Sequence, residues 1–232
     1  MDETELIRRI AAWILPILFA ITVHEVAHGW AARMLGDPTA MMLGRLTLNP
    51  LKHIDPIGTV LLPGLLLYIG GFVFGWARPV PVTWENLRRP RRDVALVAAA
   101  GPGANLLMAL VWTLAIRAGT LLLHELPWFG EPLIYMGVAG IFINIILLTL
   151  NLLPILPLDG GRVLMSLLPR PLAARYSRLE PYGLVILLAL LALGVLGQVL
   201  SPVIFLAATT LGALGGLSGS LTLQILGFLG AL

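Results

Sequence analysis

Long apolar runs separated by short polar stretches make up most of this 232-residue chain. Several of the runs reach the roughly 20 residues that an α-helix needs to cross the hydrocarbon core of a bilayer. The last run is broken near 197–202 and is long enough for two helices. The pattern predicts an all-α polytopic membrane protein with about five to six transmembrane helices, which lie within 6–35, 57–76, 94–118, 132–153 and 182–232.

The stretch after the first apolar run has a mixed pattern. A turn is expected at Gly36-Asp37-Pro38, because glycine, aspartate and proline favour turns. Residues 41–48 are consistent with a short strand or β-hairpin. The run 57–76 is interrupted by Pro63-Gly64 and Gly70-Gly71, so it either crosses the membrane or turns back as a re-entrant element.

Composition agrees with a membrane protein and narrows its chemistry. Hydrophobic residues make up 58% of the chain and charged residues only 12%, about half the roughly 25% typical of soluble domains. The net charge of +3 comes from arginines in short loops, which anchor and orient a membrane protein, so we expect no nucleic-acid partner. Because cysteine is absent, a metal must be bound by His, Asp or Glu.

Charge also predicts a topology. The loops 77–93 and 154–182 carry the arginines and should be cytoplasmic, whereas 119–131 has neither Lys nor Arg and should lie outside. These three assignments alternate correctly around the helices expected at 94–118 and 132–153. We therefore expect one membrane-embedded domain, 1–232, with a core at about 6–170, a C-terminal helical pair at about 182–232, and no soluble accessory domain.

The first apolar run contains the pentapeptide His24-Glu25-Val26-Ala27-His28. Residues four apart share one face of a helix, so the two imidazoles are able to bind one zinc ion. Glu25 lies beside them, where a carboxylate could accept a proton from water. Polar residues inside a bilayer are costly and are typically functional, so this segment predicts a metal-dependent hydrolase.

A catalytic zinc ion needs a third protein ligand, and Asp159 is the candidate. Pro154 and Pro157 interrupt the preceding helix, and Gly160-Gly161 allow a tight turn after the carboxylate. A re-entrant 57–76 would put Asp159 at a depth similar to His24 and His28, about 10–16 Å from the cytoplasmic end of the first helix. That geometry favours the re-entrant alternative.

Together these segments resemble the site-two protease family of intramembrane zinc metalloproteases. The resemblance covers about 10–170 and includes the His24–His28 pentapeptide, the segment Asn151-Leu152-Leu153-Pro154 through Leu158-Asp159-Gly160, and Ala100-Gly101-Pro102-Gly103-Ala104-Asn105. The segments 44–50, 53–58 and 75–82 are similar to the compact prokaryotic branch. The family implies that His24, His28 and Asp159 bind zinc and that Glu25 is the general base.

Four further polar residues are candidates for contacts with the substrate or the developing oxyanion. Asn105 follows Gly101-Pro102-Gly103 within an apolar run and is equally suited to a helix–helix hydrogen bond. His53 is either an interfacial histidine or a residue near the site. Asn144 and Asn151 are seven residues apart and share a helix face, where either could contact the substrate or join helices.

The predicted function is hydrolysis of a peptide bond within or next to a transmembrane segment of a membrane protein. Anti-sigma-factor-like proteins or signal-peptide remnants are substrate classes that the resemblance implies. The expected location is the plasma membrane, with the active site toward the cytoplasmic side. A membrane metal transporter using the same ligands is the alternative, although transporters are commonly built from repeats and we find none here.

Overall fold

The computed structural model describes residues 3–61, 65, 75 and 77–231. These residues form helices joined by turns, with no strand among them. Among the described residues, four helices are long and apolar enough to cross a membrane: α1 (Glu3–Met34), α4 (Pro90–Leu122), α5 (Pro127–Asn151) and α9 (Val195–Leu214). The all-α polytopic architecture is therefore confirmed, but a total of five to six spans is not.

The C-terminal region differs from the predicted helical pair at 182–232. It contains three helices, α8 (Gly183–Ala192), α9 and α10 (Gly219–Phe228). The ten residues of α8 or α10 extend only about 15 Å at 1.5 Å per residue, so neither crosses a bilayer alone. Gly194, at φ +72°, ends α8 and separates it from α9, an interruption that the apolar pattern concealed.

The segment after α1 has no hairpin at 41–48. Residues Thr39–Met42 form the short helix α2, which η1 (Pro50–Lys52) and η2 (Pro56–Leu61) follow. Gly44, at φ +63°, reverses the chain after α2, and the amide of Arg45 donates to the carbonyl of Ala40. A short helix and turns therefore occupy the residues for which a strand or hairpin was expected. Most of 57–76, where the choice between a span and a re-entrant element falls, lies outside the described residues.

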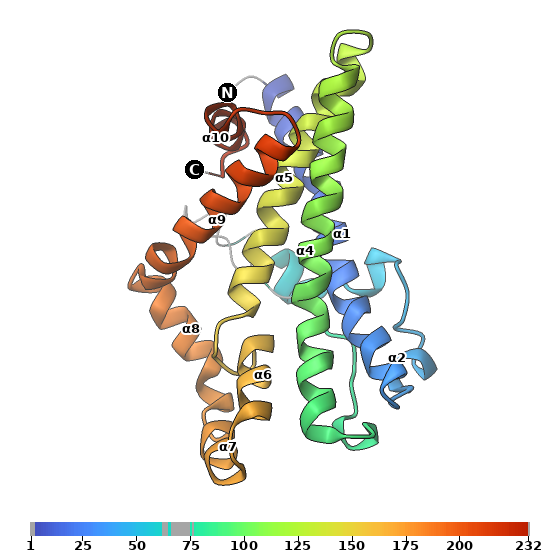
Figure 1. The fold of residues 1–232 in the computed structure, drawn as a ribbon, viewed down its shortest axis with the longest axis vertical. Coiled ribbons are helices and arrows are strands. Elements are labelled where there is room, and N and C mark those ends of the chain that lie inside the picture. The colour runs from blue at the N-terminus through green and yellow to red at the C-terminus, as the bar shows by residue number, and fades with distance from the viewer. Residues whose placement is uncertain (1–2, 62–64, 66–74, 76, 232) are drawn as a thin grey trace.

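Short helices complete the end of the molecule where α4 begins. They are η3 (Trp84–Asn86), α6 (Asp159–Leu167), α7 (Arg170–Ser177) and η4 (Glu180–Tyr182). Figure 1 shows α6 and α7 at this lower end, while both chain termini lie at the opposite end. The end of α5 therefore delivers the chain to the same end of the molecule at which α4 starts.

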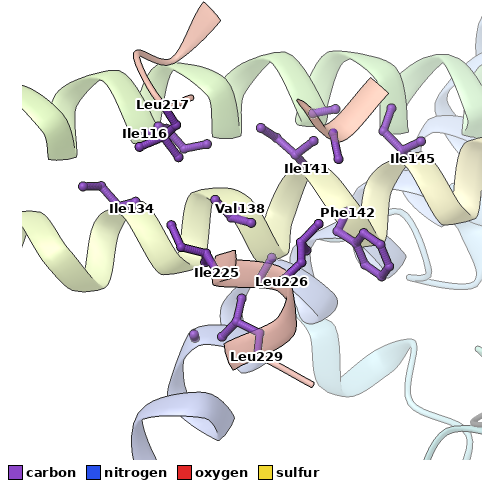
Figure 2. Packing of buried hydrophobic residues seen from close by; sticks show 14 of the residues in the cluster. Ile116, Ile134, Val138, Ile141, Phe142, Ile145, Leu217, Ile225, Leu226 and Leu229 are labelled. Atoms are coloured by element: carbon purple, nitrogen blue, oxygen red, sulfur yellow. The ribbon is translucent and has the colours of Figure 1, made fainter. Parts of the chain in front are cut away.

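The helices α4 and α5 pack closely along their length because small residues face large ones. A side-chain carbon on Gly140 would overlap Trp112, and one on Gly137 would overlap Ile116. Such contacts let helix backbones approach in a membrane, where packing rather than exclusion of water drives association. Figure 2 shows Ile116, Ile141 and their neighbours filling the space between α4, α5 and α10.

The end of α1 is tied to the segment 78–88, which we call the strap. Gly36 adopts φ +117°, and the buried carboxylate of Asp37 accepts hydrogen bonds from the amide of Thr83 (2.8 Å) and the side chain of Asn86 (2.9 Å). The amide of Arg88 donates to the carbonyl of Leu35 at 3.1 Å. Since α4 follows the strap directly, α1 ends where α4 begins.

Candidate metal centre

His24 and His28 on α1 meet Asp159, the first residue of α6. The two Nε2 atoms are 3.1 Å apart, and each lies 3.3 Å from Oδ2 of Asp159. This is the group of His, Asp and Glu residues within the described ranges that could hold a metal ion. The sequence therefore identified three residues that the fold brings together across more than a hundred positions.

These three atoms fit a zinc ion. Ligand atoms about 2.0–2.1 Å from a tetrahedral zinc ion are about 3.3–3.4 Å apart, which matches the separations between the two Nε2 atoms and Oδ2. Oδ2 of Asp159 is buried, and no hydrogen-bond donor reaches it from the described part of the chain. A buried carboxylate oxygen beside two imidazole nitrogens is a donor set suited to a divalent cation.

Glycines position Asp159 at the start of α6. A side-chain carbon on Gly160 would lie 2.5 Å from the carbonyl oxygen of Leu153, and one on Gly161 would lie 2.6 Å from the carbonyl carbon of Ile155. The chain leaving α5 therefore folds back against the first turn of α6. The Asp-Gly-Gly sequence is required by this close approach, which holds the carboxylate at the histidines.

Both imidazoles have their second nitrogen engaged. Nδ1 of His24 is 2.6 Å from Oδ1 of Asn105, and Nδ1 of His28 is 2.8 Å from the carbonyl oxygen of Val97. Because both partners accept hydrogen bonds, both Nδ1 atoms must donate. The Nε2 lone pairs then face the shared centre, the arrangement typical of metal-binding histidines.

Two of the candidate polar residues join this centre through α4 and α5. Nδ2 of Asn105 donates to Oδ1 of Asn144 at 2.9 Å and also contacts the carbonyl of Ala20 at 3.3 Å, while Nδ2 of Asn144 donates to the carbonyl of Gly140 at 2.8 Å. Both asparagines are fully buried. Their amide groups are thus engaged within the protein rather than directed toward a substrate.

The other two candidates lie in different surroundings. His53 is buried, with Nε2 2.8 Å from the carbonyl of Thr47, and its own carbonyl accepts from the amide of Arg78. Asn151 donates from Nδ2 to the carbonyl of Leu147 within α5. These hydrogen bonds do not connect either residue to His24, His28 or Asp159, so a substrate contact by His53 or Asn151 stays a prediction.

Glu25 is held by the strap. Its Oε2 accepts a hydrogen bond of 2.8 Å from the amide of Val80. The side chain of Val80 is buried against α1 at Gly29, where a side-chain carbon would lie 2.9 Å from Cγ1 of Val80. The sequence did not predict this contact, because a backbone amide hydrogen bond leaves no mark in the residue types. The alternation Pro79-Val80-Pro81-Val82 does indicate an extended segment, but it does not indicate that this segment lies against Glu25.

The charge of Asp159 follows from its neighbours. Burial alone would raise the pKa of its carboxyl group, but the imidazoles of His24 and His28, each with Nε2 3.3 Å from Oδ2, outweigh burial and hold that pKa below its usual value. The group is therefore an ionised carboxylate at neutral pH, which is the form that binds a cation.

Comparison with known proteins bears on this centre. The model of peptidase family M50 matches residues 128–193, a range that includes Asp159. The chain is 36% identical over 192 residues to "Putative zinc metalloprotease YwhC" of Bacillus subtilis, covering 82% of this chain and 84% of that protein.

Two mycobacterial proteins are also similar, both named "Putative zinc metalloprotease Rip2". The protein of Mycolicibacterium smegmatis is 32% identical over 183 residues, and that of Mycobacterium tuberculosis H37Rv is 30% identical over 181 residues. Each alignment covers 78% of this chain and 65% of the relative, so the chain spans slightly less than two thirds of these longer proteins. No solved structure matches the chain.

Proposed function

This chain belongs to peptidase family M50, the site-two protease family, and on that premise we propose which residues perform its function as an intramembrane zinc metalloprotease. His24, His28 and Asp159 are its zinc ligands. Glu25 is its general base. The observation that carries the ligand assignment is the triangle of two Nε2 atoms and Oδ2, with sides of 3.1–3.3 Å.

Zinc in such a site supplies a Lewis acid that activates water and polarises a carbonyl group. Glu25 accepts the proton that water loses and later donates it to the leaving amine. The amide of Val80 occupies one side of Oε2, which orients the carboxylate and leaves Oε1 to carry the proton. The hydrogen bonds at Nδ1 of His24 and His28 keep both imidazoles in the ligating orientation.

The proposed substrate is a membrane protein cut within or next to a transmembrane segment. The carbonyls of a helical segment are hydrogen-bonded within the helix, so the substrate must unwind locally before attack. Anti-sigma-factor-like proteins and signal-peptide remnants remain the proposed substrate classes. The mycobacterial relatives and YwhC have protease names, and nothing favours the metal-transporter alternative.

The proposed location is the plasma membrane, with the site toward the cytoplasm. His28 and His24 precede the end of α1 at Met34 by six and ten residues, or about 9 and 15 Å along the helix. The arginine-bearing strap is bonded to that same end through Leu35 and Arg88. A cytoplasmic position of the arginines therefore supports a site reached by water from the cytoplasmic side.

Purified protein tests the assignment through zinc content and cleavage of a transmembrane substrate. Glu25→Gln is expected to retain zinc and lose cleavage, whereas His24→Ala and Asp159→Ala are expected to lose both. The matched controls His124→Ala and Glu125→Gln change exposed residues between α4 and α5 and should retain both. Cleavage by Glu25→Gln at the wild-type rate would refute the general-base assignment.

A further inference from the structure

Asn105 and Asn144 form a directed chain of hydrogen bonds that ends on His24. The Nδ1 atom of His24 donates to Oδ1 of Asn105, Nδ2 of Asn105 donates to Oδ1 of Asn144, and Nδ2 of Asn144 donates to the carbonyl of Gly140. We propose that this relay fixes the tautomer and ring orientation of His24, which makes the two asparagines positioning residues for the zinc site. The inference rests on the proposed function only in naming zinc as the ion.

The direction of the relay is set by groups that can only accept. The carbonyl oxygens of Gly140 and Ala20 have no proton to donate, so Nδ2 of Asn144 must face the former and Nδ2 of Asn105 the latter. Oδ1 of Asn105 is then the atom left for His24. Nδ1 of His24 must carry a proton, and its Nε2 is left with the lone pair.

Turning either asparagine amide over, so that its oxygen and nitrogen exchange places, would place acceptor oxygens against other acceptor oxygens. If the amide of Asn105 were flipped, its Oδ1 would face both the carbonyl of Ala20 and Oδ1 of Asn144. If Asn144 were flipped as well, its Oδ1 would face the carbonyl of Gly140. Both asparagines have 0% exposure, so water could not relieve these contacts, and unmade hydrogen bonds at buried groups are strongly unfavourable.

The relay concerns His24 alone. Nδ1 of His28 donates to the backbone carbonyl of Val97, a partner that no side-chain substitution removes. On α1, His24 is therefore hydrogen-bonded to a side chain, whereas His28 is hydrogen-bonded to a main-chain carbonyl. A substitution in the relay should loosen His24 and leave His28 in the Nδ1-protonated form, so the two imidazoles report on the relay separately.

Helix packing connects the relay to the rest of the fold. Its members lie on α1, α4 and α5, and its last acceptor, Gly140, is one of the glycines at which α4 and α5 approach closely. The separation of α4 from α5 consequently sets the distance between Asn105 and Asn144. Burying two amide side chains in apolar helices is costly, and polar residues kept in membrane segments are typically functional, which agrees with a positioning role for both asparagines.

The test compares Asn105→Ala and Asn144→Ala with Thr113→Val and Thr149→Val. The controls also remove a polar group from α4 and α5, but each threonine hydroxyl bonds only to the carbonyls of its own helix. Zinc affinity is measured on full-length protein in detergent by competition with a chelator. The relay variants should lose roughly 10–100-fold in affinity, as is typical when the hydrogen-bond partner of a metal-binding histidine is removed, and the controls should retain the wild-type value.

The second measurement is the tautomeric state of His24 in zinc-free protein labelled with 15N-histidine, with His24→Ala used to assign its signals. The Nδ1-protonated form should dominate in the wild type and both controls, whereas in Asn105→Ala the two tautomers should be mixed and His28 unchanged. A wild-type tautomer ratio in folded Asn105→Ala would overturn the proposal. Because this readout needs no metal, it remains decisive even if His24→Ala fails to reduce zinc binding, which would instead refute the proposed ligand set.

Discussion

A side-chain carbon on Gly101 would lie 2.6 Å from Cε1 of His28, so the backbone of α4 is in direct contact with the imidazole. The same position would bring it 2.6 Å from Cε1 of His24. The glycine is therefore a condition for the two histidines to lie between α1 and α4 with their Nε2 atoms toward Asp159.

Replacement of Gly101 by alanine should displace both imidazoles and sharply reduce zinc content and cleavage. The matched variant is Gly103→Ala, because a side-chain carbon at Gly103 meets nothing within 4 Å. There the change should be neutral or stabilise α4 by up to about 1 kcal/mol through helix propensity. Zinc analysis and cleavage assays on both purified proteins check the prediction, and an active Gly101→Ala variant with full zinc content would contradict it.

Asp37 should make the attachment of the strap to α1 sensitive to acid. Burial would raise the pKa of its carboxyl group, but hydrogen bonds from Thr39, Asn86 and Thr83 outweigh burial and lower that pKa below the ordinary 3.8. Because the folded-state pKa is depressed, the stabilisation is fully present above the ordinary value. It is lost as the pH falls below 3.8 toward the folded-state pKa.

The variant Asp37→Asn should therefore lower the free energy of unfolding at pH 7 by about 1–3 kcal/mol, the range for disrupting buried hydrogen bonds. The difference in Tm between this variant and the wild type should narrow as the pH is lowered through and below 3.8. Thermal unfolding in detergent measures it, and Glu85→Gln, which changes an exposed carboxylate of the strap, should match the wild type throughout. A difference in Tm that stays constant with pH would count against a depressed pKa.

The orientation of the protein can be read with single cysteines, since the chain has none of its own. Glu125→Cys lies between α4 and α5, and Arg175→Cys lies in α7 at the opposite end. In right-side-out vesicles a membrane-impermeant maleimide should label the first at once and the second only after permeabilisation. The reverse pattern would put the metal centre nearer the outer face and would refute the cytoplasmic assignment.

The metal centre was largely predictable because its components have strong local signatures. The spacing of His24 and His28 follows from helix periodicity alone, and prolines and glycines mark the break in the helix around Asp159. The roles of Asn105 and Asn144 were not predictable to the same degree. Their partners depend on how α4 is rotated against α1 and α5, which a single sequence does not specify, so a substrate contact and a helix contact looked alike.

The fold was predicted less evenly. The apolar runs located α1, α4 and α5 well, but α5 begins at Pro127 rather than near Pro132, since an apolar pattern does not show where a helix extends beyond the bilayer. The short strand or hairpin expected at 41–48 does not form in the structure. A local turn at Gly44 and the hydrogen bond from the amide of Thr39 to Asp37 accompany α2 instead, and Asp37 is held in place by the long-range hydrogen bond from Thr83.

The arrival of Asp159 only after α5 has a consequence for biosynthesis. During translation α1 and its histidines emerge first, then Gly101 and Asn105 on α4, and last the carboxylate at the start of α6. Asn144 lies on α5, directly before α6, so the proposed orienting contact of His24 and the proposed third ligand become available within the same late part of synthesis. With the proposed ligand set, a nascent chain that stalls before this point carries two histidines but no third ligand, and we expect it to lack zinc-dependent activity.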